Sequence, residues 1–274
     1  MSGKKDKWGF WIKKNTPELV GKTFENSKGH LYTVLNRLTV DRYLIVFHKT
    51  GFITSLTNKD VKSGMIKDLY APEVYGVGYM GEGVSKRDTP LITKAYATWS
   101  GMMRRCYAEW ERHKNPSYAG CVVSDDWHHF REFLLWFEDN YIEGFHLDKD
   151  VLSPVGYKVY SKDTCEYVPR HINTLFTNTK AKRGAYPQGV YYKKKNRKFV
   201  AQVCNGRGIQ THLGLYDTPE EAYAVYMKKK MEVSKKILRD ALNNKCISDK
   251  FYVKSIKYLE NQLKGEYECL INVY

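Results

Sequence analysis

Apolar and polar residues alternate along several short stretches of the chain and recur at helical spacing along others. Near the N-terminus, HLYTVLNRLTV and DRYLIVFHK are rich in β-branched and aromatic residues, and Thr50-Gly51 separates the second stretch from FITSLT. Such runs between short turns are typical of antiparallel strands. The pattern predicts a β-rich module over residues 18–75. Its role is not legible from the sequence, and a protein partner is one candidate.

Two helices with apolar faces are predicted in the middle of the chain. The first covers KAYATWSGMMRRCYAEW, and the second begins after Ser124 at the N-cap position, with Asp125 and Asp126 in its first turn. Apolar side chains at helical spacing form both faces. They are Tyr96, Trp99, Met103, Cys106 and Trp110 in the first helix, and Trp127, Phe130, Leu134, Phe137 and Tyr141 in the second. Both faces are expected to form core.

A glycine-rich stretch, GVGYMGEGVSKRD at residues 76–88, precedes these helices. It contains the spacing GxGxxG, which in dinucleotide-binding proteins cradles a pyrophosphate. That motif also needs a strand before it and an acidic residue about 20 positions later. The sequence after it predicts a turn and then a helix with basic residues at its centre. We therefore interpret the stretch as a linker or loop.

The order strand, strand, helix is predicted next, from FHLDKDVL, EYV and a helix opened by Pro169. Further on, FVAQV and THLGLY predict strands joined by a turn at Asn205-Gly206. The run Thr218-Pro219-Glu220-Glu221 has the residues of a helix capping box. That helix is expected to continue through VSKKILRDAL. Another helix is expected in VKSIKYLENQL, followed by a short strand-like end.

These elements predict an α+β protein of several modules. The central module joins the helix pair to a ββα unit, and the C-terminal module is a three-stranded antiparallel sheet plus a helix. The expected segments are a basic N-terminal tail (1–17), the β-rich module (18–75), a Gly-rich linker (76–93), the helix pair with the ββα unit (94–180), the sheet-plus-helix module (181–242) and a C-terminal helical tail (243–274).

Composition narrows the class of protein. With 42% hydrophobic and 14% aromatic residues, the 274-residue chain is not mainly disordered. No apolar run approaches the roughly 18 residues of a membrane span, and the basic start lacks the apolar region of a secretory signal. The six cysteines form no CxxC pair, so neither a zinc site nor a disulfide framework is expected. We expect a cytoplasmic protein without a small-molecule cofactor.

Positive charge is concentrated in one region. Residues 180–239 hold 15 Lys and Arg against four Asp and Glu, a local net charge of +11 in a chain of +15. Lysines and arginines near phosphates release condensed counterions, so such a cluster indicates a polyanionic partner. A solvated basic face is the alternative. Base stacking on the 22 tyrosines also leaves RNA open as a ligand.

The stretch G-V-Y-Y…K-F-V-A-Q-V…H-L-G-L-Y-D-T-P-E-E-A-Y-A-V-Y resembles the plant Apetala/ethylene-response-factor DNA-binding domain, which also occurs in phage and bacterial homing endonucleases. The resemblance implies that the sheet enters the major groove of double-stranded DNA. It places Cys204 on the exposed sheet face with the DNA-binding residues. We expect those residues to be Tyr191, Lys193, Lys194, Lys195, Arg197, Lys198, Gln202, Arg207 and His212.

The stretch L-D-K-D…Y-S-K-D-T-C-E-Y-V-P-R-H-I-N resembles the HNH endonuclease-like phage proteins. The resemblance implies a ββα unit that holds one divalent metal, Mg²⁺ or Mn²⁺, at the scissile phosphate. Asp148 matches the metal-binding acid and Asn173 the last motif residue, and Asp150 is a further ligand candidate. Lys149 stands where active enzymes place a histidine base.

A substitute base would come from His146 or His171. Since strands have a period of two, His146, Asp148 and Asp150 are expected to share a face. The structural alternative is that both aspartates pair with neighbouring lysines and that Asn173 braces the turn. Together the two resemblances favour a phage-type, metal-dependent DNA-nicking or -cleaving endonuclease. The alternative is a catalytically degenerate HNH scaffold that only binds DNA or serves as a regulatory or interaction protein.

Overall fold

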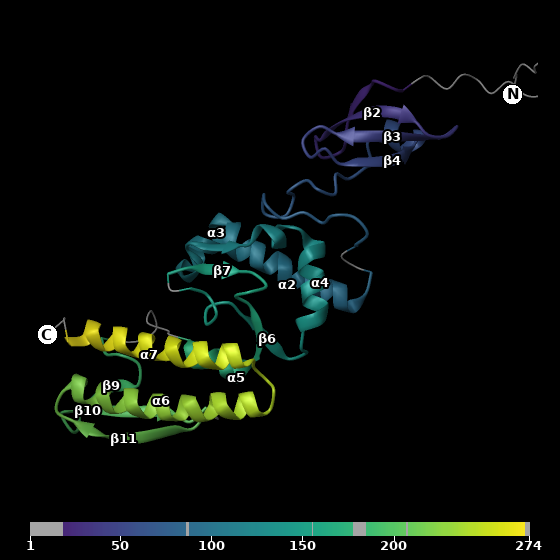
Figure 1. Ribbon diagram of the computed structural model, residues 1–274. Helices are drawn as coiled ribbons and strands as arrows, with labels where there is room; N and C mark the ends of the chain where they lie inside the picture. The colour runs from purple at the N-terminus through teal and green to yellow at the C-terminus, as the bar shows by residue number, and fades with distance from the viewer. Residues whose placement is uncertain (1–18, 86–87, 155, 178–184, 207, 272–274) are drawn as a thin grey trace, which may run out of the picture.

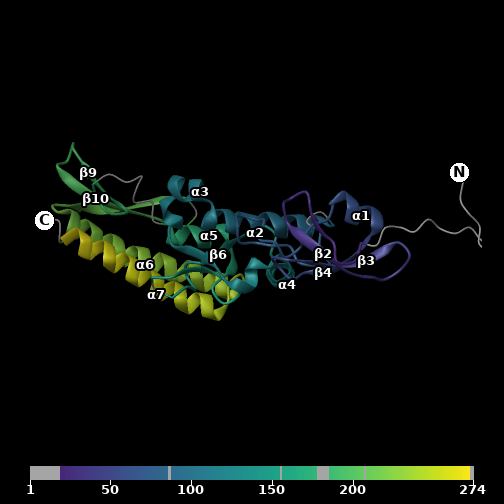
Figure 2. The same cartoon turned by 90° about the horizontal axis from the view of Figure 1, so that it is seen from above.

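The protein has an α+β fold, as the sequence predicts, with antiparallel sheets at both ends and helices between them (Figure 1). The computed structural model describes residues 19–85, 88–154, 156–177, 185–206 and 208–271. Seen from above, the N-terminal sheet, the central helices and the C-terminal sheet with its helices follow one another along the molecule (Figure 2). Among the described residues, no helix is both long and apolar enough to cross a bilayer.

The N-terminal module is the predicted β-rich unit. Its strands β1 (Thr23–Glu25), β2 (Leu31–Arg37), β3 (Arg42–Phe47) and β4 (Ile53–Thr57) pair in chain order as an antiparallel sheet, and α1 (Asn58–Ser63) follows. The alternating apolar residues of β2 and β3 face inward, and Tyr32, Tyr43 and Phe47 are fully buried. The Tyr32 hydroxyl donates to the Val61 carbonyl oxygen at 2.8 Å, which joins α1 to the sheet.

The central helix pair consists of α2 (Pro90–Tyr107) and α4 (Phe130–Asn140), with α3 (Glu109–Lys114) and β5 (Cys121–Val123) between them. Their apolar faces share one core, in which the indole N–H of Trp99 donates to the Trp127 carbonyl oxygen at 2.6 Å. Two details differ from the prediction. Trp110 lies in α3 and is 57% exposed, and Ser124 precedes a 3-10 turn, Asp125–His128, rather than the α-helix.

The glycine-rich stretch packs against this core. Gly81 has a φ of +73°, and a Cβ there would lie 1.7 Å from Nε2 of His129. A Cβ at Gly78 would lie 2.8 Å from the ring of Trp99. These glycines therefore allow the backbone to approach aromatic side chains, a use that accounts for them without a phosphate.

The ββα unit is built from β6 (Phe145–Asp148), β8 (Glu166–Pro169) and α5 (Arg170–Asn173), with a 3-10 turn Thr174–Phe176 after α5. Strands β6 and β8 are antiparallel, whereas β7 (Lys158–Tyr160) pairs with β5 in parallel. The predicted first strand is too long, because β6 ends at Asp148. The expectation that Asp150 shares a strand face with His146 and Asp148 is therefore wrong.

The C-terminal module is the predicted sheet plus helix. Strands β9 (Val190–Lys193), β10 (Lys198–Cys204) and β11 (Gln210–Tyr216) form an antiparallel sheet with β10 in the centre, and α6 (Pro219–Asn243) covers one face. Thr218 accepts a hydrogen bond from the Glu221 N–H at 3.2 Å, as the capping sequence predicts. Gly189, with φ +83°, lets β9 approach the Tyr226 ring, where a Cβ would clash at 2.2 Å.

The last helix, α7 (Asp249–Ile271), is an integral part of the fold rather than a tail. It lies beside α6, and its apolar residues enter two cores, one with the ββα unit and one with the C-terminal sheet. The N–H and hydroxyl of Ser248, just before α7, donate to the Glu166 carboxylate of β8 at 2.7 and 2.6 Å. The sequence predicts a short strand-like end after this helix. Up to Ile271 this prediction is wrong, because the chain is helical there.

Candidate functional site

The open face of the C-terminal sheet carries the residues expected to read DNA. Ala201 and Val203 of β10 are buried against α6, so alternation places Gln202 on the opposite face. Residues paired across strands share a face, and Gln202 pairs with His212 while Val200 pairs with Tyr191. Lys193 and Lys198 form a further pair on this face.

Cys204 belongs to the open face by the same alternation, but it is half-buried. The Lys230 side chain of α6 lies close to the Cys204 sulfur. Strand β9 pairs with β10 only as far as Ala201, so Cys204 lies beyond the part of β10 that β9 covers. Cys204 is therefore less accessible than the resemblance implies. Arg207, the remaining residue expected to contact DNA, lies outside the described residues.

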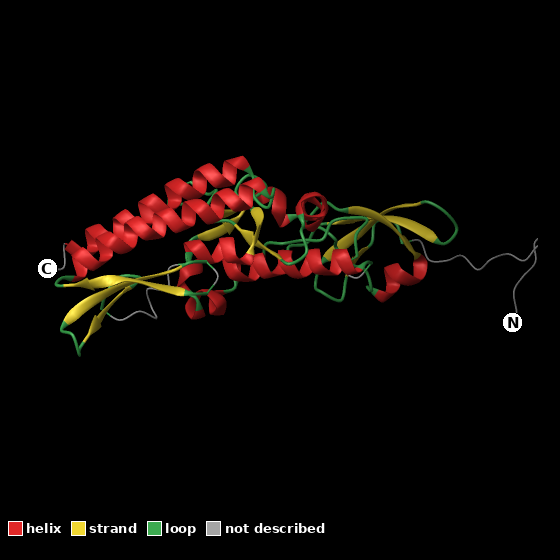
Figure 3. Cartoon of the chain, turned by 90° about the horizontal axis from the view of Figure 1, so that it is seen from below, coloured by secondary structure: helices red, strands yellow, loops and turns green. Residues whose placement is uncertain are grey.

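Most of the expected DNA-binding lysines lie at one tip of the sheet. The hairpin turn between β9 and β10 contains Lys194, Lys195 and Arg197, and all three side chains are exposed. This hairpin projects from the module in Figure 3. In the described part of the chain, no ion pair involves these residues or Lys193, whereas Lys198 is bound to Asp217 at 2.7 Å. The tip is thus a concentrated positive charge that no acidic side chain of the described residues compensates.

The exposed basic residues of α6 lie on the other side of the module. Because α6 covers the inner face of the sheet, its exposed lysines and arginine lie away from the open face (Figure 3). The exposed basic residues on that side include Lys228, Lys235, Lys236 and Arg239. The described basic residues of the hairpin and of α6 therefore lie on two surfaces, of which the hairpin tip adjoins the predicted readers.

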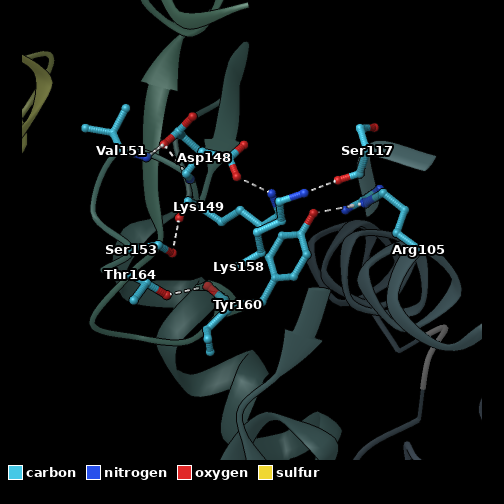
Figure 4. Close-up of polar contacts among 11 residues, drawn as sticks. Arg105, Ser117, Asp148, Lys149, Val151, Ser153, Lys158, Tyr160 and Thr164 are labelled. Atoms are coloured by element: carbon cyan, nitrogen blue, oxygen red, sulfur yellow. Dashed lines mark hydrogen bonds and ion pairs between the residues drawn. The ribbon is translucent and has the colours of Figure 1, made fainter. Parts of the chain in front are cut away.

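The turn after β6 brings together Asp148, Lys149 and Asp150. Figure 4 shows Asp148 and Lys149 at this turn. Asp148 is 5% exposed, and its Oδ1 accepts the N–H groups of Asp150 and Val151, both at 3.1 Å. Burial raises the pKa of Asp148 to about 6, because its effect outweighs that of the backbone hydrogen bonds, which lower the pKa. Asp148 therefore shapes the turn through its carboxylate.

Lys149 points into the protein. Its ammonium contacts the Asp150 carboxylate at 2.5 Å and lies 5.4 Å from the Tyr160 ring centroid. Figure 4 shows the Lys149 side chain running toward Tyr160, whose hydroxyl accepts from Nε of Arg105 at 3.1 Å. Burial lowers the pKa of Lys149, but the Asp150 charge and the Tyr160 phenol outweigh burial and leave it raised. Lys149 is thus a fixed cation rather than a base.

The two histidines expected as substitute bases are placed differently. His146 lies on β6 opposite Val168, with an exposed side chain. His171, also exposed, lines a cavity with Asn205 and Asp240, and Asp148 is not part of that lining. Asn173 is half-buried on α5, and within the described ranges no hydrogen bond joins it to Asp148 or Asp150. The structure therefore groups only the two aspartates with Lys149.

A divalent metal does not fit this turn as it stands. A lysine ammonium already lies against one of the two carboxylates, and a second positive charge there would be repelled. The other carboxylate already accepts two backbone hydrogen bonds. Asp150 has the lysine partner that the structural alternative expects, whereas Asp148 binds backbone instead. The described part of the chain contains no group of three or more His, Cys, Asp or Glu placed to hold a metal.

Sequence reasoning missed two groups of residues near this turn. The Lys149 ammonium lies over the rings of Tyr118 and Tyr160, and the Arg105 guanidinium lies over the same two rings. Tyr160 lies in the HNH-like stretch, but the resemblance gives it no role. Lys254 and Lys257 of α7 lie beside the loop that follows the turn. The spacing of lysines at 250, 254, 257 and 264 is helical, so the second group could have been found from the sequence. No family model, curated protein or solved structure matches the chain.

Proposed function

We propose that this chain binds double-stranded DNA through the open face of its C-terminal sheet, and that its HNH-like unit is a scaffold rather than a nuclease. The observation that carries the binding half is that Tyr191, Gln202 and His212 share one face of the sheet, next to a basic hairpin with no acidic partner among the described residues. A narrow antiparallel sheet enters the major groove, where side-chain amides and cations reach base edges. The hairpin lysines would then lie along the phosphates.

The scaffold half rests on Lys149. A general base must lose its proton near neutral pH, and the Asp150 carboxylate keeps this ammonium charged. The same ammonium opposes a divalent cation at the turn. Among the two readings of the HNH resemblance, this arrangement favours the degenerate scaffold, in which α7 and the ββα unit hold the DNA-binding module in place.

The binding half is tested by fluorescence anisotropy with a duplex, each of its single strands and an RNA of the same sequence. The duplex should bind most tightly, and unlabelled duplex should displace the single strands. Preference for a single strand or for RNA would overturn the duplex proposal and favour stacking on the tyrosines.

The scaffold half is tested on supercoiled plasmid with Mg²⁺ or Mn²⁺. Wild type should leave the plasmid supercoiled. Nicking that needs the metal, stops with chelator and is lost in Asp148→Asn would overturn this half in favour of an endonuclease. Cleavage gained only in Lys149→His would support it, because the unit would then be a decayed nuclease in which Lys149 stands in place of the base.

A further inference from the structure

A cavity of about 470 Å³ lies between α7 and the loop that follows the Asp148 turn. Three lysines, two tyrosines and two side-chain amides line it together with Asp150. The residues that matter for its chemistry are Lys158, Lys254, Lys257, Tyr157, Tyr258 and Asn261. Ligand sites commonly combine aromatic side chains with a small number of placed polar or charged groups, and the lining of this cavity has both.

The cavity carries an excess of positive charge. Its one acid, Asp150, is already bound by the Lys149 ammonium. Within the described ranges no acidic side chain pairs with Lys254 or Lys257, and Lys158 donates only to the Ser117 carbonyl oxygen at 2.7 Å. The ammonium of Lys158 is thus engaged outside the cavity lining, whereas Lys254 and Lys257 have no acidic partner among the described residues, so an anion is the expected occupant.

Helix α7 fixes the position of these groups. Lys254, Lys257 and Asn261 follow at helical spacing on one face, while Phe251 and Leu259 on another face are fully buried. The Tyr258 ring packs edge-on against Phe176, with centroids 5.7 Å apart, so its position is fixed as well. Tyr157, in contrast, is 68% exposed at the cavity, and no ring contact joins it to another described residue.

This cavity is separate from the open face of the sheet. The sheet and the pair α6 and α7 form two layers, as Figures 2 and 3 show, and the α7 lysines are exposed on the helix side. A straight duplex on the open face would therefore not reach the cavity. Duplex binding at the open face thus does not account for the cavity.

We propose that the cavity binds the phosphate of a single nucleotide unit, with the lysines and Asn261 around the phosphate and Tyr157 stacked on the base. The nucleotide could be a free mononucleotide or the 5′ end of a strand, since both present the same phosphate and base. Lysine is a usual phosphate ligand, and a base stacks on any exposed aromatic ring. The proposal does not depend on duplex binding by the sheet.

The test compares a single-stranded hexanucleotide with and without a 5′-phosphate, and adenosine 5′-monophosphate with adenosine, by calorimetry. The phosphate should tighten binding of the hexanucleotide, the mononucleotide or both by about tenfold or more, as charge-assisted hydrogen bonds imply. Lys254→Ala with Lys257→Ala should remove this difference. A gain with both probes points to free nucleotide as the source, and a gain with the oligonucleotide alone points to a strand end.

Two controls separate this proposal from duplex binding. Lys264→Ala removes a lysine of the same helix that is 75% exposed and pairs with Glu268, and it should keep the phosphate preference. Lys193→Ala with Lys195→Ala should also keep it, even where duplex binding is lost. Equal binding of phosphorylated and unphosphorylated probes, or a preference that survives in the Lys254 and Lys257 variant, would overturn the proposal. A thermal melt checks that each variant is folded.

Discussion

Lys149 and Asp150, neighbours in the sequence, form an ion pair in which the lysine is buried and the aspartate faces solvent. The Lys149 side chain is 7% exposed and that of Asp150 45%. The lysine lies among tyrosine rings, so it depends on this carboxylate as its only described acidic partner. The motif that resembles a catalytic one thus contains a charge pair that stabilises the turn.

We predict that Asp150→Asn lowers the free energy of unfolding by about 1–3 kcal/mol, because it leaves a buried ammonium without its partner. Lys149→Met should cost less, since the remaining carboxylate is solvated and methionine keeps most of the volume. Glu232→Gln breaks an exposed pair with Lys229 and should change stability by less than about 0.5 kcal/mol. Urea unfolding at neutral pH measures all three. Equal losses for Asp150→Asn and Glu232→Gln would contradict the buried role.

A second prediction concerns pH. Burial raises the pKa of Asp148 from 3.8 to about 6. Between these two pH values the folded protein therefore holds a proton on Asp148 that the unfolded chain has already lost. The stability contributed by this group is complete below the unfolded pKa and is lost as the pH rises through about 6. Asn in its place can still accept the two backbone N–H groups but does not ionise.

The unfolding free energy of wild type, minus that of Asp148→Asn, should therefore fall by up to about 3 kcal/mol between about pH 4 and about pH 7. Taking the difference cancels the other titrating groups. Urea unfolding at several pH values measures it. A difference that is flat, or that rises with pH, would show that Asp148 is not a buried acid of raised pKa.

The strands and the capped helix were predictable because local patterns determine them. The Thr218 hydroxyl caps α6 by accepting from the N–H of Glu221, only three residues later in the sequence. Along β10, more buried and more exposed side chains alternate over most of the strand. The end of β6 was not predictable from periodicity. There the Asp148 carboxylate binds the backbone two and three residues later and turns the chain, although the apolar pattern continues.

Long-range contacts explain what else the sequence did not predict. Lys149 points inward because Tyr118 and Tyr160, from separate segments, supply a place for its ammonium. Helix α7 is not a tail because Glu166, 82 residues before Ser248, holds its start. Neither relationship leaves a local signal. The expected readers of the sheet came from the family resemblance. Alternation along β10 accounts for Gln202, whereas the face of His212 also depends on the register shift between Ala201 and Gln202.

A third prediction addresses the phosphate contacts. If the hairpin between β9 and β10 lies along DNA phosphates, duplex affinity should fall with salt with a log–log slope on the order of −5. Lys193→Ala, Lys195→Ala and Arg197→Ala together should weaken binding to all sequences alike and flatten the slope by about 2–3. Anisotropy titrations over a range of salt concentrations measure both effects.

The matched control removes the same charge from the helix side. Lys228→Ala, Lys236→Ala and Arg239→Ala lie on α6, away from the open face, and should leave the slope nearly unchanged. If both triple variants flatten the slope equally, the protein attracts DNA by its overall charge and the hairpin is not the contact surface.

The last prediction concerns base recognition by one cross-strand pair. Gln202 and His212 are register partners on the open face, so their side chains lie side by side where a groove floor would meet the sheet. Gln202→Ala and His212→Ala should each relax selectivity at one or two adjacent positions of a preferred site, at about 1–3 kcal/mol per base pair. Selection from random duplexes, followed by the same selection with each variant, measures this.

Thr211→Ala is the control, because Thr211 pairs with Val203 on the other face and should leave the selected motif unchanged. A selection that enriches no motif with wild type would instead make the sheet a non-specific clamp, held to the duplex by the hairpin lysines.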